Sequence, residues 1–519
     1  MFGASLGILS QALEVFRKSI DIGNRNILNA NNPDYAEERP EVRSIYPGGI
    51  LLDDVTRLQN FYYFKLRNSK LSVVSYLNER SGYNARVEDI FQEFIEGLGG
   101  SEYINNFYNA YIDLMKDPNN AGSKESFINS AISLSNFLRQ RKGDLDKFNG
   151  DIDYTMRSYV RKINDLTKKI AQINKDITVQ YAMTYAKGKD YKNLLDERDR
   201  YLRELSELIN IEIKEDELGR VRVDTSKGFV LVEDRFSWSL RYEAGNLFWQ
   251  SKDGSEVVMN DIIEGGKVKG LIDFRKDLDN YKTQLDQVAK NLISRVFIPV
   301  ETGNNWYWMK PLDSPLTPVG ISGSMVFDYG GGQFTINYNP GDTLTDIANA
   351  INSDPSNGGR FVASVVSNPD GTYTLHIQTS DPSYTVTDSN SNVYRAERVF
   401  SGTSANDIGT DTNLEVNIDD LDFSKTDEFT DLARDWWNQT GDIYKNLINT
   451  IASTQNDLKR NEEIESALLS SIDAKLKEYQ GVSVDKEFME IMAIKRVYEA
   501  SAKMVKAIDE LIQTTINMV

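Results

Sequence analysis

The chain holds few residues whose type and spacing could support chemistry, and its single histidine is the first of them. His376 lies in the alternating stretch TYTLHIQTS at 372–380. A catalytic histidine needs a nucleophile or a carboxylate placed beside it, and no Gly-x-Ser-x-Gly motif surrounds a serine of this chain. A histidine on such a strand is far more often a core or surface residue, so we expect no catalysis from His376.

Two glycine- or oxygen-rich segments resemble ligand-binding loops, but neither is complete. The segment DYGGGQF at 328–334 lacks the Lys-Ser/Thr pair and the helix that a phosphate-binding loop requires. The run DSNSN at 388–392 has the oxygen spacing of a calcium loop, but Val393 replaces the glycine and the closing glutamate is missing. The carboxylate pairs 53–54 and 419–420 have no pocket signature around them. We therefore expect turns and solvated loops here, and no enzyme, metal or cofactor.

Composition narrows the classes of function further. A length of 519 residues suggests about three domains. The 59 basic and 78 acidic residues give a net charge of −19, which repels nucleic acid and anionic membrane surfaces. The absence of cysteine excludes disulfides and thiolate metal sites, and no apolar run is long enough to span a membrane. The N-terminal residues lack the pattern of a cleaved signal, so we expect any export to use another route.

The elements that would position a function begin with an apolar ladder at the N-terminus. Spacing of alternately three and four residues continues over four heptads, which is typical of a coiled-coil seam. The Asn-rich segment before Pro33 should end this helix, because the residue before a proline disfavours helical angles. The seam residues are Leu6, Leu9, Leu13, Phe16, Ile20 and Ile27.

A matching ladder closes the chain and supplies the partner helix. Its seam residues are Ile491, Ile494, Tyr498, Ser501, Val505, Ile508, Ile512, Thr515 and Val519. A second stripe, spaced seven residues apart, runs beside it through Val497, Met504, Leu511 and Met518. A helix that is apolar on two faces needs two neighbours. We therefore predict that the two terminal helices pair and that the second stripe packs between subunits.

Helical periodicity also dominates the middle of the chain. It is strongest over 100–116, 148–177, 194–209, 271–292 and 429–479. Short connections between such helices favour an elongated antiparallel bundle. Alternating patterns typical of strands occupy about 211–265 and 300–400.

We predict an α+β fold, with a helical bundle, a terminal coiled-coil helix pair and inserted mainly-β domains. The predicted domains are a terminal coiled-coil domain of residues 1–50 with 480–519, a helical bundle of 51–299 with 401–479 that carries a β interval at about 211–265, and an inserted β surface domain of 300–400.

Two terminal motifs resemble the bacterial flagellar axial proteins. The N-terminal motif NILNANNPDY is similar to their signature Asn-Ile-x-Asn-x-Asn-Thr-Pro-Gly-Tyr, and GVSVD with the later segment YEASA resembles their closing signature. The matching residues are Asn26, Asn29, Asn31, Pro33, Tyr35, Gly481, Val482, Ser483, Asp485, Tyr498, Ala500, Ser501 and Ala502. The chain departs from the family at Asn32, at Asp34 in place of glycine, and at Glu38 near the usual arginine. We expect Asp34 to keep the turn by adopting left-handed backbone angles.

The helical middle indicates which branch of this family the chain resembles. Segments 107–120, 163–177, 193–209 and 265–289 are similar, in order, to the FlgK family of hook-associated proteins. Hook and rod proteins have β-rich middles instead. Residues 334–353 with the strands that follow resemble a small unit of flagellins and filament-cap proteins.

This resemblance implies a structural adaptor without catalysis at the junction between hook and filament. It implies that the chain self-associates in a ring through its paired terminal helices, contacts hook protein on one side and the next hook-associated or filament protein on the other, and binds an export chaperone through its last helix. It also implies secretion through the flagellar type III channel to the extracellular flagellum. The alternatives are another axial component, such as hook protein, or a surface-exposed binding or adhesion module.

Overall fold

The computed structural model describes residues 2–46, 48–93, 95, 97–187, 191–300, 305–418 and 426–517. The carboxylate pair 419–420 and Met518 lie outside these residues. The chain forms two compact units, one of Met1–Ser81, Asp153–Asp273 and Leu458–Val519, and another of Gly82–Ile152 and Phe274–Asp457. The unit boundaries fall within four long helices: α2 (Phe61–Phe91), α4 (Ala121–Lys187), α6 (Gly266–Arg295) and α9 (Thr426–Gln480).

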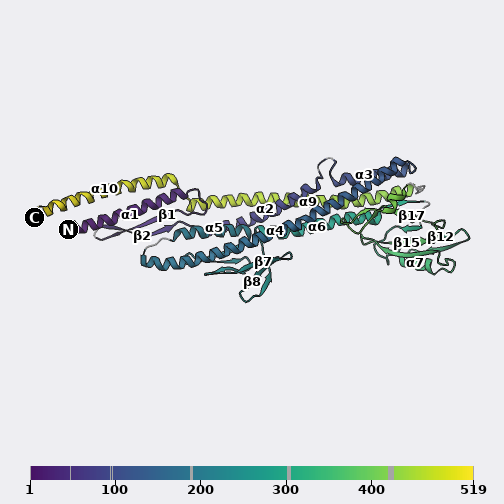
Figure 1. Cartoon of the computed structure of the whole chain (residues 1–519), viewed down its shortest axis with the longest axis horizontal. Coiled ribbons are helices and arrows are strands. Elements are labelled where there is room, and N and C mark those ends of the chain that lie inside the picture. Colours follow the sequence, from purple (N-terminus) through teal and green to yellow (C-terminus); the bar gives the residue numbers. More distant parts are fainter. Residues whose placement is uncertain are drawn as a thin grey trace. The chain divides into compact units, whose positions relative to one another are not determined.

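The first unit contains both chain ends. Helix α1 (Phe2–Asn29) and helix α10 (Val484–Asn517) lie side by side and antiparallel (Figure 1), as the two apolar ladders predicted. A hairpin of β1 (Glu38–Ile45) and β2 (Gly49–Arg57) also contacts α1. The sequence patterns had indicated neither this hairpin nor helix α2.

The same unit carries two small antiparallel sheets. One has the order β3 (Ile211–Glu215), β4 (Val221–Thr225), β5 (Val230–Glu233) and β6 (Phe236–Ser237), and the other β7 (Ser239–Glu243), β8 (Asn246–Gln250) and β9 (Glu256–Val258). Two asparagines of α4 attach these sheets. The side-chain amide of each exchanges a pair of hydrogen bonds with the backbone of a residue in the sheet, as a backbone peptide group does. Asn164 exchanges two hydrogen bonds of 2.8 Å with the backbone of Leu240, and Asn174 exchanges bonds of 2.7 and 2.9 Å with Val221. Strands therefore occupy 211–258, within the segment where the sequence predicted alternating β patterns.

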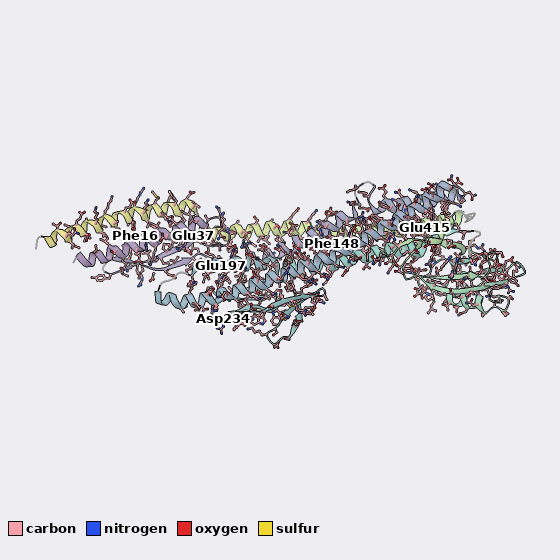
Figure 2. All side chains as sticks on the ribbon, viewed as in Figure 1. Phe16, Glu37, Phe148, Glu197, Asp234 and Glu415 are labelled. Carbon is pink, nitrogen blue, oxygen red and sulfur yellow. The ribbon has the colours of Figure 1, made fainter. Side chains whose placement is uncertain are left out.

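The second unit has an aromatic helical core. Helix α3 (Gly100–Lys116) places Phe107 and Tyr111 against Trp436 of α9, at ring distances of 5.3 and 5.8 Å. Phe148 of α4, labelled in Figure 2, packs edge-on against Phe274 of α6 at 5.6 Å. All five rings are nearly or completely buried. Their burial explains the strong 3.6-residue periodicity of these helices.

The insertion into this unit folds as two antiparallel sheets and a helix. The five-stranded sheet has the order β10 (Phe297–Pro299), β17 (Val393–Arg398), β11 (Trp306–Met309), β15 (Tyr373–Thr379) and β14 (Phe361–Ser367), and the three-stranded sheet the order β13 (Gln333–Tyr338), β12 (Gly323–Asp328) and β16 (Thr385–Asp388). Helix α7 (Leu344–Ser353) begins with a capping box of Thr343 and Asp346. The buried core includes Phe327, Phe361 and Ile351.

Short elements complete the chain: helix α5 (Lys192–Leu208), strands β18 (Phe400–Ser401) and β19 (Gly409–Thr410), and helix α8 (Thr412–Asn417). The α+β class is confirmed, with long terminal helices and inserted antiparallel sheets. The three-part domain division stays a prediction. In the described part of the chain, no helix is long and apolar enough to cross a membrane.

Candidate assembly interface

The buried amide of Asn26 organises the end of α1. Its Nδ2 donates to the carbonyl of Glu38 at 2.9 Å and to the Glu487 carboxylate of α10 at 3.0 Å. Its Oδ1 accepts from the Tyr35 hydroxyl at 2.7 Å and from the Glu38 backbone N–H at 3.0 Å. One side chain therefore joins the helix end, the following turn, the start of the hairpin and the partner helix.

The other N-terminal motif residues shape the turn between α1 and β1. The Asn29 side chain donates to the carbonyl of Arg25 at 3.0 Å, and Asn32 N–H donates to the carbonyl of Asn29 at 2.8 Å. Asn31 and Pro33 are exposed, whereas Tyr35 is buried. Burial, followed by the charge of Glu38, raises the pKa of the Tyr35 hydroxyl well above its usual range. This hydroxyl is therefore a neutral donor at any physiological pH.

The expectation for Asp34 was wrong, because this residue does not have a positive φ. The turn instead uses its side chain, which is buried and accepts bonds of 2.8 and 3.0 Å from the Arg203 guanidinium of α5. Arg67 of α2 lies 3.7 Å from the same carboxylate and 2.7 Å from Asp473 of α9. Charge pairing thus anchors the turn at a place where the family has glycine.

A further family departure, Glu38, also has a partner within this chain. Its buried carboxylate lies 2.7 Å from the Arg25 guanidinium. A second ionic group lies close by, where Arg57 of β2 contacts Asp196 and Asp199 of α5 at 2.7 and 2.8 Å. Burial raises the pKa of Asp196 to about 6, although Arg57 acts in the opposite direction.

The C-terminal motif begins at the connection between α9 and α10. Gly481 N–H donates to the carbonyl of Lys477 at 2.8 Å, and a Cβ at Gly481 would lie 2.4 Å from that oxygen. Only glycine fits this turn. Glu37, labelled in Figure 2, donates its N–H to the carbonyl of Gln480 at 2.9 Å, so the two motif turns are hydrogen-bonded neighbours. Val482 is half-buried, and Ser483 and Asp485 are exposed.

The predicted seam of α10 coincides with the side of the helix that is covered. Ser501 is buried, Thr515 is exposed, and Val519 lies outside the described residues. The remaining seam residues are half-buried: Ile491, Ile494, Tyr498, Val505, Ile508 and Ile512. The pairing is tight at Gly23 of α1, where a Cβ would lie 2.8 Å from the Ile491 side chain. The seam also extends to Glu487, which lies four residues before Ile491. Glu487 is the residue of α10 that accepts a hydrogen bond from Asn26.

The predicted seam of α1 is only half-buried at Leu6, Leu9, Leu13, Phe16, Ile20 and Ile27. The most buried residues lie one position earlier in the sequence: Val15, Ser19, Ile22 and Asn26. The hairpin, which also contacts α1, supplies a second neighbour for this helix. Phe16, labelled in Figure 2, thus belongs to a stripe that one subunit covers only in part.

A second apolar ladder of α10 is exposed. It has the same three–four spacing and alternates small with large residues: Ala493, Val497, Ala500, Met504, Ala507 and Leu511. The large members Val497, Met504 and Leu511 are 49%, 51% and 54% exposed. It includes the motif residue Ala500, while Ala502 is half-buried beside it. The heptad spacing of a coiled-coil seam is therefore repeated on a face that α1 does not cover.

The residues that the sequence analysis considered for catalysis or ligand binding make contacts within the fold. His376 stacks between Trp306 and Trp308 at 4.7 and 4.3 Å, and burial together with the charge of Arg398 lowers its pKa to about 4. The 328–334 segment forms the turn between β12 and β13, as predicted. Among the described residues, no group of three or more His, Asp or Glu side chains is placed to hold a metal ion.

The calcium-like run is also a turn. The Asp388 carboxylate accepts from the Tyr338 hydroxyl and from Asn392 N–H, both at 2.8 Å. Ser391, within the same turn, takes a positive φ of 53°. In the first unit, Asp53 lies 3.3 Å from Arg43 across the hairpin. Each of these acidic groups therefore has a hydrogen-bond or ion-pair partner within the chain.

Two family descriptions match the chain. "Flagellar hook-associated protein FlgK helical domain" matches residues 84–296, and "Flagellar basal body rod FlgEFG protein C-terminal" matches 477–518, which includes α10. Paired terminal helices around a helical domain, together with these matches, define a flagellar axial protein.

Named flagellar proteins are similar to parts of this chain. Flagellar hook-associated protein 1 of Escherichia coli K12 is 22% identical over 442 residues, which are 76% of this chain and 75% of that protein. Its namesake in Salmonella typhimurium is 20% identical over 250 residues, and the match spans 46% of this chain and only 44% of that protein. The flagellar hook junction protein FlgK of Burkholderia pseudomallei aligns with a TM-score of 0.47 at 14% identity, over 79% of this chain and 99% of that structure. The chain is thus similar to FlgK, the flagellar hook-associated protein 1, in its helical domain and over about three quarters of its length.

Proposed function

We propose that this protein is a structural adaptor of the bacterial flagellum, seated at the junction between hook and filament and without catalytic activity. The observation that carries the proposal is the exposed ladder of α10. An exposed apolar helix face is unfavourable in water, because burial of apolar surface lowers the free energy by about 25 cal/mol for each Å². Packing against a neighbouring subunit removes that cost.

The proposed assembly places copies of the α1–α10 pair side by side in a ring. The seam joins the two helices within one subunit, and the exposed ladder meets the helix pair of the next. Hook protein then lies on one side of the ring, and the next hook-associated or filament protein lies on the other. The chain reaches this place by type III export, and before export a chaperone covers the exposed ladder of α10.

The ladder itself can be tested in cells by complementing a strain that lacks this gene. We expect Met504→Glu to abolish incorporation into flagella, because it places a charge in the middle of the ladder. Gln513→Glu is the matched control: it adds the same charge to α10 at an exposed position away from both ladders. Normal motility and filament attachment with Met504→Glu would contradict the proposed packing. Failure of both variants would point to charge alone.

A further inference from the structure

One face of α4, in the first unit, carries a row of exposed basic side chains. Its members, here called the basic stripe, are Arg157, Arg161, Lys168 and Lys175. Their spacing of four and seven residues places them within about 40° of one another around the helix axis, along about 27 Å of its length. Residues 153–179 contain six basic and three acidic residues, whereas the whole chain has a net charge of −19. The basic stripe is therefore a local reversal of the charge of the chain.

The fold does not compensate the charge of the basic stripe. Within the described part of the chain, none of its four side chains forms an ion pair or a side-chain hydrogen bond. The residues that directly follow two of its members do find partners. Lys162 lies 2.7 Å from Glu204 of α5, and Lys169 lies 2.8 Å from Asp165. Like charges four residues apart, such as the first two members of the stripe, destabilise a helix. A partner outside this subunit would relieve that repulsion.

The neighbours of α4 leave the basic stripe open. On one flank, Asn164 joins the helix to strand β7. On the other flank, Lys162 joins it to α5. Apolar side chains lie at the two ends of the open face, where Tyr154 is 73% exposed and Val179 is 43% exposed. A molecule that pairs with the stripe can therefore also bury apolar surface at its ends.

We propose that the basic stripe binds an acidic α-helix of a partner protein, whose carboxylates recur along one face at helical spacing. Nucleic acids and anionic membranes are also negative, but the net charge of −19 repels such extended polyanions. A helix presents a single narrow row of charges, which fits a single row on α4. Opposite charges at seven-residue spacing align neighbouring helices in coiled coils in the same way. This surface is independent of the exposed ladder of α10 and of the proposed junction role.

A synthetic helix of alanine and glutamate is the probe, with its glutamates at the spacing that complements the stripe. The control peptide has the same composition, but its glutamates are spread around the helix. Fluorescence anisotropy of the labelled peptides measures their binding to the intact chain. We expect a dissociation constant of about 0.1–1 mM at ~10 mM salt, where the Debye length is about 30 Å, and binding of the control peptide that is about fivefold weaker. Equal affinities would overturn the proposal, because they would show attraction without a geometric match.

Two double variants separate the basic stripe from overall charge. Arg161→Gln with Lys168→Gln removes the centre of the stripe and should weaken binding of the complementary peptide about tenfold. Lys445→Gln with Lys459→Gln is the matched control, because it removes two exposed cations from α9. It should leave the affinity within about twofold. An equal loss in both double variants would overturn the proposal, since overall charge would then explain the binding.

The same variants test the competing occupants. We expect duplex DNA and phosphatidylserine vesicles to bind the intact chain more weakly than the complementary peptide does. Tighter binding of either one that is lost in Arg161→Gln with Lys168→Gln would overturn the proposal. Self-association, measured by sedimentation, would also overturn it if this double variant alone abolished it, because a second copy would then occupy the stripe.

Discussion

Replacement of Asn26 by alanine tests how the end of α1 is fastened. The substitution removes four hydrogen bonds, which reach Tyr35, both backbone groups of Glu38, and Glu487 of α10. Each contributes a net ~1 kcal/mol to stability. Water that enters the truncated site and the better helix propensity of alanine restore part of the loss. We therefore expect the free energy for local opening of this segment to fall by about 2–4 kcal/mol.

Hydrogen exchange of the full-length chain measures this quantity directly. The amide of Glu38 donates to the Asn26 side chain, so peptides that contain it report the loss. A decrease of 2–4 kcal/mol corresponds to roughly 30- to 1000-fold faster exchange. Asn24→Ala is the matched control, because Asn24 is an exposed asparagine of the same helix. It should change exchange by less than about 0.5 kcal/mol.

The reasoning fails if the two variants exchange alike. Equal protection in Asn26→Ala and Asn24→Ala would mean that the four hydrogen bonds do not hold the turn. Rapid exchange of the same peptides in the unaltered protein would contradict the docking of α1 and the hairpin altogether.

Three further predictions concern other parts of the fold. Asp196→Asn should raise the free energy of unfolding at pH 8 by about 1–2 kcal/mol, because the pKa of Asp196 rises from 3.8 to about 6 on folding and stability falls as pH increases through that range. Denaturant titrations at pH 4 and pH 8 check this, with the neighbouring, half-buried Glu197→Gln as the control (Figure 2). As the pH falls from 6.5 to 4, the unaltered protein should lose up to about 3 kcal/mol of unfolding free energy, because folding lowers the pKa of His376 to about 4, and His376→Phe should remove this loss. Thermal melts across that pH range would contradict the prediction if the variant and the unaltered protein lose stability equally. Val505→Pro or Leu13→Pro should break the terminal helices, at ~3 kcal/mol or more, yet leave the aromatic core of the second unit folded, as tryptophan fluorescence and limited proteolysis can show.

The sequence predicted the partner helix of α1 because its apolar spacing is strict. On α10, the predicted seam lies on the covered side from Ile491 to Ile512, whereas Thr515 is exposed. The surplus stripe of Val497, Met504 and Leu511 is exposed within one subunit. On α1 the buried face is displaced by one residue, to Val15 and Ile22. Periodicity fixes that a helix has an apolar side, but the neighbours that cover it decide which residues are buried.

Apolar periodicity could not predict the hairpin at 38–57 or the hydrogen-bond network around Asn26. The hairpin carries charges on both strands, so its alternation is weak, although Pro47-Gly48-Gly49 is a turn signal that could have revealed it. Asn26 and Tyr35 were recognised only as motif residues. Their partner Glu487 comes from the far end of the chain, and spacing alone does not show which polar groups meet across such a distance. Extending the α10 ladder back by four residues would have placed Glu487 in the seam.

Deletion of the gene in its flagellated source tests the central claim most directly. Electron micrographs of the cells and an assay for flagellin in the medium are the two readouts. The junction role predicts bare hooks, with flagellin released into the medium. Intact filaments would contradict any essential place in the flagellar axis, and cells without hooks would contradict the junction position by moving the protein to an earlier stage of assembly.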